Sequence, residues 1–174
     1  MNEKSGMENR FVNSREYWEY RFSSGDWNKF EGNRQSEFFA QLAVDNFPEW
    51  LKDELSIYQW NITDIGCAQG DGSAVLARNF PSCHVTGIDF SENAINNAKE
   101  RFPYCDFTVG NITLDIRKTD VIFSSNTLEH LKNPRSIMEK ICNAVDKYAI
   151  FILPFEDKSG ISEHFYIFNR RFFP

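Results

Sequence analysis

An acid followed by three glycines marks the stretch 61–73, which reads Asn-Ile-Thr-Asp-Ile-Gly-Cys-Ala-Gln-Gly-Asp-Gly-Ser. Asp64 closes a short apolar run, and Gly66, Gly70 and Gly72 permit a tight turn and the close approach of a ligand to bare backbone. The next residues have the apolar spacing of a helix, whose first N–H groups lack partners within the helix. A strand, a glycine loop and a helix in this order predict a site for a small ligand with an anionic group.

The glycine spacing excludes two common phosphate-binding motifs. The second position after Gly66 is Ala68, so no register fits the G-x-G-x-x-G fingerprint, and no Gly-Lys-Ser/Thr follows as a P-loop requires. Asp89 ends a second predicted strand, 84–89, and an acid there, about 20 residues after the loop, accepts hydrogen bonds from ribose hydroxyls in nucleoside-binding units. The alternative for Asp89 is a helix N-cap, a role for which Ser91 is better placed. These features favour a ligand that contains a nucleoside.

The elements needed to position these residues alternate along the chain. Strands are predicted to end at Asp64 and to span 84–89, 106–110, 120–125 and 148–153. Helices are expected after three of these strands, with the last one opened by Asn133-Pro134. The run 148–153 is so apolar that we expect a central strand covered on both faces. The prediction is an α/β, Rossmann-like, doubly wound and mostly parallel sheet with helices on both faces.

Composition limits the function classes. The chain has 174 residues, of which 41% are hydrophobic, so it can form one globular domain. We expect residues 1–50 to form an N-terminal helical lid segment and residues 51–174 to form the ligand-binding domain. The net charge of -6 argues against a protein that depends on binding nucleic-acid phosphates.

Cysteine usage and hydropathy indicate the compartment. The four cysteines form no C-x-x-C pair, which argues against a zinc framework or a disulfide scaffold and favours reduced thiols. No signal-peptide core is evident, and no apolar run approaches the length of about 18 residues needed for a membrane span. We therefore expect a cytoplasmic protein.

Two motifs together resemble one enzyme family. Asp64-Ile65-Gly66-Cys67-Ala68-Gln69-Gly70 resembles motif I, D/E-x-G-x-G-x-G, of class I S-adenosylmethionine-dependent methyltransferases, with alanine for the middle glycine. Leu128-Glu129-His130-Leu131 matches a signature of the methyltransferases called type 11. The resemblance implies S-adenosylmethionine as cofactor, with S-adenosylhomocysteine as product. The implied cofactor-binding residues are Asp64, Gly66, Cys67, Ala68, Gly70, Asp89, Phe90, Asn111, Ile112, Ser125 and Asn126.

The resemblance also implies the reaction. We expect methyl transfer to a small-molecule or glycan-linked acceptor at oxygen. The alternatives are an RNA-modifying methyltransferase, for which the arginine clusters are thin, and a non-catalytic domain that binds cofactor or a partner. An oxygen acceptor must lose a proton, and His130 is the candidate base, with packing beside the following helix as its alternative role.

A metal-assisted variant of the reaction is less favoured. Ubiquinone-pathway and small-RNA 3′-end methyltransferases with an E-x-x-E-H pattern in this loop hold a divalent ion there. Here Asn126 replaces the first acid, so Mg²⁺ should bind less well, and we assign no metal ligand; a second Glu163-His164 pair follows downstream.

The end of the sequence departs from the family pattern. The family fold normally continues with a sixth and an antiparallel seventh strand, whereas this sequence stops at Pro174. We expect a truncated piece of a longer protein, with a sheet that ends early as the alternative. The aromatic segments 165–168 and 172–173 would then leave apolar surface uncovered, which predicts a possible homodimer through this end.

Overall fold

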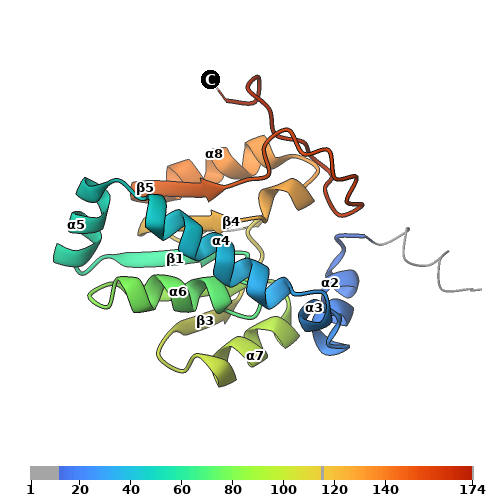
Figure 1. Cartoon of the computed structure of the whole chain (residues 1–174), viewed down its shortest axis with the longest axis horizontal. Coiled ribbons are helices and arrows are strands. Elements are labelled where there is room, and N and C mark those ends of the chain that lie inside the picture. The colour runs from blue at the N-terminus through green and yellow to red at the C-terminus, as the bar shows by residue number, and fades with distance from the viewer. Residues whose placement is uncertain (1–11, 115, 174) are drawn as a thin grey trace, which may run out of the picture.

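The computed structural model describes residues 12–114 and 116–173 and contains one five-stranded, wholly parallel sheet. Its strands lie in the order β3-β2-β1-β4-β5 (Figure 1). Their bounds are β1 Asn61–Ile65, β2 His84–Asp89, β3 Asp106–Val109, β4 Thr119–Ser125 and β5 Val145–Ile152. The strand order reverses between β1 and β4, and this is the switch point at which open α/β sheets bind ligands. The predicted fold class is confirmed.

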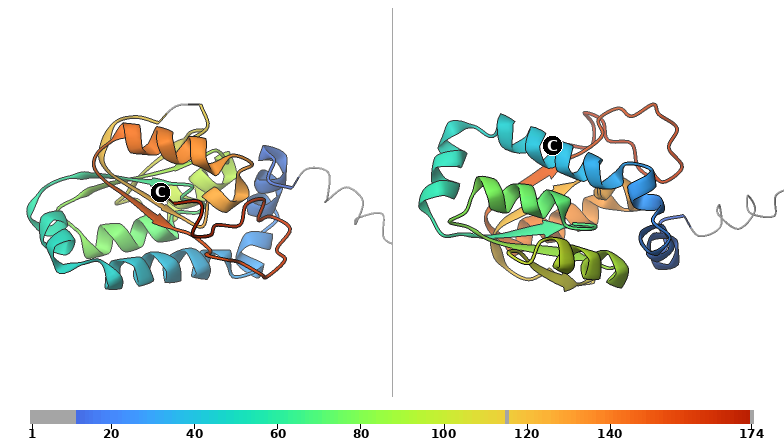
Figure 2. Two further views of the ribbon diagram at one scale, coloured as in Figure 1. Left: turned by 90° about the horizontal axis from the view of Figure 1, so that it is seen from above. Right: turned by 60° about the horizontal axis from the view of Figure 1, so that its bottom comes forward.

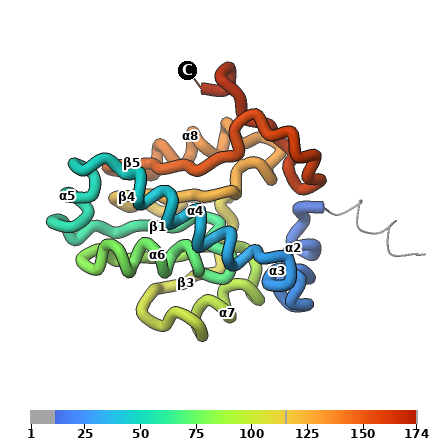
Figure 3. Tube along the Cα trace, viewed as in Figure 1, coloured from blue at the N-terminus to red at the C-terminus, as the bar shows by residue number. Residues whose placement is uncertain are grey.

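Helices cover both faces of the sheet, as Figure 2 shows from two further directions. One face carries α4 Gly32–Asn46, α5 Glu49–Ile57, α6 Asp71–Asn79 and α7 Glu92–Arg101, and the other carries α8 Pro134–Ala144. The two cores follow from strand alternation: Ile62 of β1 faces the first group of helices, and Ile65 faces α8. The remaining α-helices, α2 Arg15–Ser23 and α3 Asp26–Lys29, lie at one end of the sheet (Figure 3), where α2 packs on α7 and α3 packs on α4.

Only part of the expected lid segment 1–50 lies away from the sheet. Its first eleven residues are outside the described residues. Helix α4 buries Ala40, Ala43 and Val44 in the main core, so it belongs to the helical layer. We use the name lid for residues 12–30, which include α2 and α3.

One expectation about the carboxyl-terminal end is wrong, and another holds only in part. The run that ends β5 was expected at the centre of a sheet, but β5 pairs only with β4 among the described strands and is an edge strand. The aromatic tail was expected to lie uncovered, yet Phe168 and Phe172 are buried against α8 because the chain folds back over that face. Phe165, Ile167 and Phe173 remain exposed.

Within the described residues, no helix combines the length and apolarity required to cross a bilayer.

Candidate functional site

A cavity of about 480 Å³ lies at the carboxyl edge of the sheet, over the switch point between β1 and β4. Two sets of residues enclose it, one after the ends of β1 to β4 and one from the lid. We call these the sheet wall and the lid wall. Cavities with mostly apolar walls and a few directed polar groups are the usual sites for small ligands.

The glycine loop forms the floor of the sheet wall. Gly66 has a φ of 76°, and a Cβ placed there would lie 2.4 Å from the Thr127 hydroxyl oxygen, so only glycine fits. The amides of Gly66 and Cys67 both donate to the Ile88 carbonyl, at 2.8 and 3.1 Å, which fixes the loop to β2. Ala68 also has a positive φ, 48°, a conformation that costs a non-glycine residue about 1–2 kcal/mol. The alanine that departs from the motif therefore keeps the backbone conformation of the glycine it replaces.

Asp89 joins the glycine loop to the start of α7. Its carboxylate accepts from the Ala68 amide at 3.1 Å and from the Ser91 amide at 2.9 Å, and its side chain borders the cavity. Burial raises the pKa of Asp89 to about 6, although these backbone hydrogen bonds oppose the shift. The N-cap of α7 is Ser91, whose hydroxyl accepts from the Ala94 amide, so Asp89 is not needed for that role.

Asp64 lies behind the loop. The Ser73 hydroxyl donates to it at 2.6 Å, and burial raises its pKa to about 7. It is 3% exposed, so it supports the loop from below without bordering the cavity.

The structure separates the sequence-predicted cofactor residues into two groups. Seven line the cavity: Gly66, Ala68, Asp89, Phe90, Asn111, Ile112 and Asn126. Four do not: Asp64, Cys67, Gly70 and Ser125.

Gly70 has a φ of 83° where α6 begins, and a Cβ there would lie 2.7 Å from Phe107, so it permits close packing of helix on sheet. The Asn111 side-chain oxygen accepts from the amide and hydroxyl of Thr113 at 2.9 and 2.8 Å, which shapes the loop after β3.

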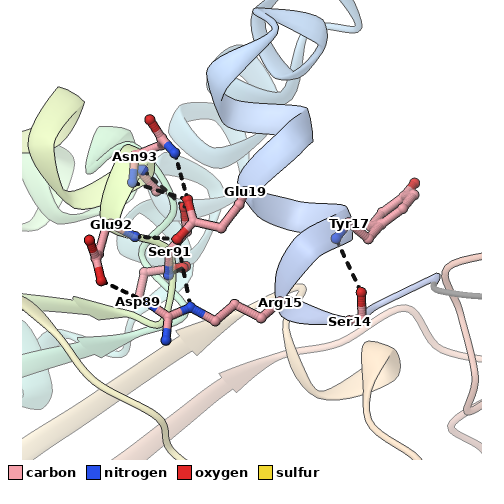
Figure 4. Close-up of polar contacts among 9 residues, drawn as sticks. Ser14, Arg15, Tyr17, Glu19, Asp89, Ser91, Glu92 and Asn93 are labelled. Atoms are coloured by element: carbon pink, nitrogen blue, oxygen red, sulfur yellow. Dashed lines mark hydrogen bonds and ion pairs between the residues drawn. The ribbon is translucent and has the colours of Figure 1, made fainter.

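The lid wall is aromatic and is fastened to α7 by Glu19. Trp18, Phe22 and Trp27 border the cavity and pack on one another, with ring centroids 5.2–6.0 Å apart. Figure 4 shows Glu19 of α2 pointing to the N-terminus of α7. There it accepts from the Ser91 hydroxyl at 2.7 Å, the Glu92 amide at 2.8 Å and the Asn93 side chain at 2.8 Å. Burial opposes ionisation of Glu19, but these donors outweigh it and lower its pKa to about 2.

His130 lines the cavity and meets the lid wall at Trp18. It closes the short 3-10 helix Leu128–His130 after β4, and its ring lies 5.2 Å from that of Trp18. Its Nδ1 is 2.9 Å from the Glu163 carbonyl oxygen, which can only accept, so Nδ1 carries the proton and Nε2 keeps a free lone pair. Burial lowers the pKa of His130 to about 4, and the ring is uncharged at neutral pH.

The C-terminal segment, residues 153–173, holds the lid near His130. The Glu163 carboxylate accepts from Tyr17 at 2.5 Å and from Arg21 at 2.9 Å. The Asn13 side-chain amide donates to the carbonyls of His130 and Glu163, at 3.1 and 2.6 Å. These contacts join residues 117 to 150 positions apart, so periodicity and local motifs could not reveal them. Sequence reasoning did not name two sets of cavity residues. These are Asn13, Arg15, Trp18, Phe22 and Trp27 of the lid wall, and Ile88, Val109, Gly110, Thr113, Thr127 and Leu131 of the sheet wall.

The family comparison agrees with this arrangement of strands and loop. A family described as "Methyltransferase domain" matches residues 59–159, more than half of the chain. The trans-aconitate 2-methyltransferase of Rhodopseudomonas palustris strain BisB18 is 28% identical over 149 residues, covering 80% of this chain and 54% of that protein. The corresponding enzyme of Escherichia coli strain K12 / DH10B is 24% identical over 98 residues, covering 55% of this chain and 39% of that protein. The chain thus spans about half the length of the curated relatives it matches, or less.

Solved structures share the fold at low sequence identity. The plantazolicin methyltransferase BpumL, solved with a monoazolic substrate analogue and SAH, has a TM-score of 0.67 and 24% identity, covering 92% of this chain and 65% of that one. The magnesium protoporphyrin IX methyltransferase of Synechocystis PCC 6803, solved with SAM, has a TM-score of 0.62 and 15% identity, covering 99% of this chain and 82% of that one. At these identities the likeness concerns the fold.

Proposed function

Since the chain belongs to this methyltransferase domain family, we propose that it binds S-adenosylmethionine and methylates a small-molecule acceptor at oxygen. One observation carries the proposal. A single cavity is lined by the glycine loop and Asp89 and also by His130, and the lid aromatics lie against both, with Phe22 packed on Ala68 and Trp18 beside His130. Residues suited to a cofactor and to an acceptor therefore share one space. Holding two reactants in alignment can lower a barrier by about 7–11 kcal/mol in favourable cases.

The residues present fit the cofactor. Gly66, where any Cβ would clash, leaves bare backbone at the floor, and Asp89 offers carboxylate oxygens suited to ribose hydroxyls. Phe90 and Ile112 supply apolar surface for an adenine ring on the same wall, and Asn111 and Asn126 supply polar groups. When bound, the cofactor supplies a methyl group made electrophilic by its sulfonium.

The lid side fits an acceptor. Trp18, Phe22 and Trp27 exclude water and offer apolar surface, while His130 presents the one imidazole on the cavity wall. As the new O–CH₃ bond forms and the S–CH₃ bond breaks, the acceptor hydroxyl proton passes to Nε2 of His130. General-base help is worth about 10²–10⁴-fold in rate when the pKa of the base lies near the working pH, so the pKa of about 4 places His130 at the low end of that range.

A small acceptor is preferred to a nucleic acid. The net charge of -6 opposes phosphate binding, and Arg15, the arginine on the cavity wall, is already paired with Glu92 at 2.9 Å. An RNA-modifying enzyme and a non-catalytic binding domain are the competing assignments.

A homodimer through Phe165, Ile167 and Phe173 stays a prediction that rests on their exposure alone.

Calorimetric titration with S-adenosylhomocysteine, with NADH as control, tests the cofactor. We expect saturable binding of the former only; a folded chain that binds neither would refute the proposal.

The acceptor class is tested by incubating the chain with methyl-labelled cofactor and fractionated cell extract. Label in small metabolites supports the proposal, whereas label in RNA, or in no fraction despite cofactor binding, supports one of the competing assignments.

A further inference from the structure

Three aromatic rings of the lid wall border the cavity and contact one another. Phe22 is buried against Ala68 of the glycine loop. The ring of Trp18 lies 5.2 Å from the ring of His130. Trp27 contacts both of the other rings, with its ring centroid 5.2 Å from that of Phe22 and 6.0 Å from that of Trp18. We call Trp18, Phe22 and Trp27 the aromatic trio.

The folded core fixes the position of Trp27 in this trio. A Cβ built at Gly32 would lie only 2.3 Å from Cδ2 of the indole ring, so the ring packs directly on the backbone of this glycine. Gly32 is buried and opens α4, a helix that packs in the main core. The ring is therefore held in place without a ligand, and a ligand that uses it loses little conformational entropy on that account.

Few charged side chains of the cavity can attract a positively charged group of a ligand. Among the described residues that line the cavity, those with a formal charge are Arg15 and Asp89. Asp89 already accepts from the amides of Ala68 and Ser91 and is the residue proposed for ribose. Burial lowers the pKa of His130 to about 4, so its ring is uncharged at neutral pH. The electron-rich faces of the aromatic trio are thus the side-chain groups of the lid wall that attract a cation.

The reactive end of the proposed cofactor must lie beside the aromatic trio. Methyl transfer needs sulfur, methyl carbon and acceptor oxygen in line, with the glycine loop behind the sulfur and His130 next to the acceptor oxygen. The methyl group then lies between Ala68 and His130. Phe22 packs on the first of these residues and Trp18 lies against the second, so the trio spans this interval. This step rests on the proposed function.

We propose that Trp18, Phe22 and Trp27 recognise the positive charge on the sulfonium of S-adenosylmethionine by cation–π attraction. Such contacts contribute about two- to thirtyfold in affinity. When the S–CH₃ bond breaks, its electron pair stays on sulfur, and S-adenosylhomocysteine carries no charge at that atom. The aromatic trio therefore binds the methyl donor in preference to the spent product. Because the charge decreases toward the transition state, this attraction selects the ligand and does not accelerate the transfer.

Trp27 should contribute the most of the three residues. The guanidinium carbon of Arg21 lies 5.6 Å from the centroid of Trp18, so this ring already interacts with one cation. Glu163 balances that cation at 2.9 Å. Within the described part of the chain, no such cation lies over Trp27 or Phe22. Indole attracts cations more strongly than a phenyl ring does, which ranks Trp27 above Phe22.

Equilibrium binding without an acceptor tests the proposal. Calorimetric titration compares S-adenosylmethionine and S-adenosylhomocysteine with sinefungin, in which a carbon that bears an ammonium group replaces the sulfur. Leucine in Trp27→Leu keeps an apolar side chain but has no π-system. Its affinity for the two cationic ligands should fall about five- to thirtyfold more than its affinity for S-adenosylhomocysteine. Equal losses for charged and neutral ligands in the folded variant would overturn the proposal.

Matched variants locate the effect. Phe22→Leu and Trp18→Leu should lower the same affinity ratio by smaller factors. Gly32→Ala should also lower it, because the new methyl group displaces Trp27 while every cavity side chain is kept. The control is Trp50→Leu on α5, an exposed tryptophan outside the cavity, which should leave the ratio unchanged. Circular dichroism verifies the fold of each variant, and a control that lowers the ratio as much as Trp27→Leu would contradict the assignment.

Fluorinated tryptophan separates charge from shape and does not depend on the leucine variants. Fluorine withdraws electron density from the face of the ring while its shape changes little. Growth on mono- and difluorotryptophan replaces all four tryptophans, of which Trp50 and Trp60 lie outside the cavity lining. The affinity ratio of S-adenosylmethionine to S-adenosylhomocysteine should fall with each added fluorine, and a constant ratio would overturn the proposal.

The same titrations distinguish this inference from the proposed function. A folded, unmodified chain that binds none of the three ligands would refute the cofactor assignment and, with it, the role of the aromatic trio. A chain that binds S-adenosylhomocysteine, but whose affinity ratio no change in the trio alters, would refute the role of the trio alone.

Discussion

The two walls of the cavity are held in place in different ways. The sheet wall follows the ends of adjacent parallel strands, and its loop is tied by short backbone hydrogen bonds from Gly66 and Cys67 to Ile88. The lid wall consists of two short helices held by polar side-chain contacts, chiefly those of Glu19 with α7 and of Glu163 with α2, and by the packing of Phe22 on Ala68 and Ala94. We therefore expect the sheet wall to be disturbed only together with the core, and the lid wall to be able to detach while the core stays folded.

The carboxylates in the two walls show the same contrast. Burial raises the pKa of Asp64 to about 7 and that of Asp89 to about 6. The ionised forms of these two acids therefore lower the free energy of unfolding. Glu19 has its pKa lowered to about 2 despite partial burial, because four hydrogen bonds favour its charged form. Ionised acids therefore weaken the sheet wall and strengthen the lid wall.

The largest effect is expected where the sheet wall leaves no space. Gly66→Ala combines a disfavoured φ with a clash against Thr127, so the free energy of unfolding should fall by about 2–5 kcal/mol. Affinity for S-adenosylhomocysteine should fall more than tenfold. Urea denaturation and calorimetry measure the two effects.

Gly160→Ala is the matched control for this substitution. Gly160 has a φ of 70°, but an added Cβ would meet nothing within 4 Å, so only the backbone cost of about 1–2 kcal/mol applies. Ligand affinity should not change. Equal destabilisation by the two substitutions would show that the clash at Thr127 is relieved and that the sheet wall is less rigid than its contacts indicate.

A smaller, pH-dependent effect is expected at Asp64. Its pKa is raised from 3.8 to about 7 on folding, so its contribution to stability is fully present below about pH 4 and is lost as the pH rises through 7. Asp64→Asn should thus gain stability relative to the unmodified chain between pH 4 and 7, by on the order of 2–4 kcal/mol. Denaturation at several pH values measures this difference, with the exposed Asp53→Asn on α5 as control. A difference that does not vary with pH would mean that Asp64 ionises normally.

The sheet wall could be predicted from the sequence because each of its parts is local. Asp64, Gly66 and Asp89 lie at strand ends that apolar periodicity reveals, and the reversal of strand order brings those ends together.

The lid wall and the approach of His164 to Glu129 could not be predicted in the same way. Glu19 and Asn13 are ordinary polar residues in a polar segment, and only the folded chain places them against Ser91 and Glu163. His164 was noted as part of a second Glu-His pair, but its approach to Glu129 depends on the course of an irregular segment of more than ten residues after β5. The position of β5 at the edge of the sheet was missed, because an apolar run indicates that a strand is buried and does not indicate its place in the strand order.

The smallest effect is expected from Glu19→Gln, which tests whether the lid wall moves independently. Glutamine keeps one acceptor oxygen but loses the charge that the α7 N-terminus favours, so S-adenosylhomocysteine affinity should fall by up to about tenfold with the core intact. Because the pKa of Glu19 is lowered from 4.5 to about 2, its contribution to stability is complete above pH 4.5 and is lost as the pH falls toward 2. The stability difference between the two proteins should therefore be constant from pH 5 to 7 and shrink below pH 4.5. Glu16→Gln, an exposed change on the same helix, is the control and should leave ligand affinity unchanged. A loss of core stability as large as that of Gly66→Ala would mean that the two walls fold as one unit, and the contrast between them would fail.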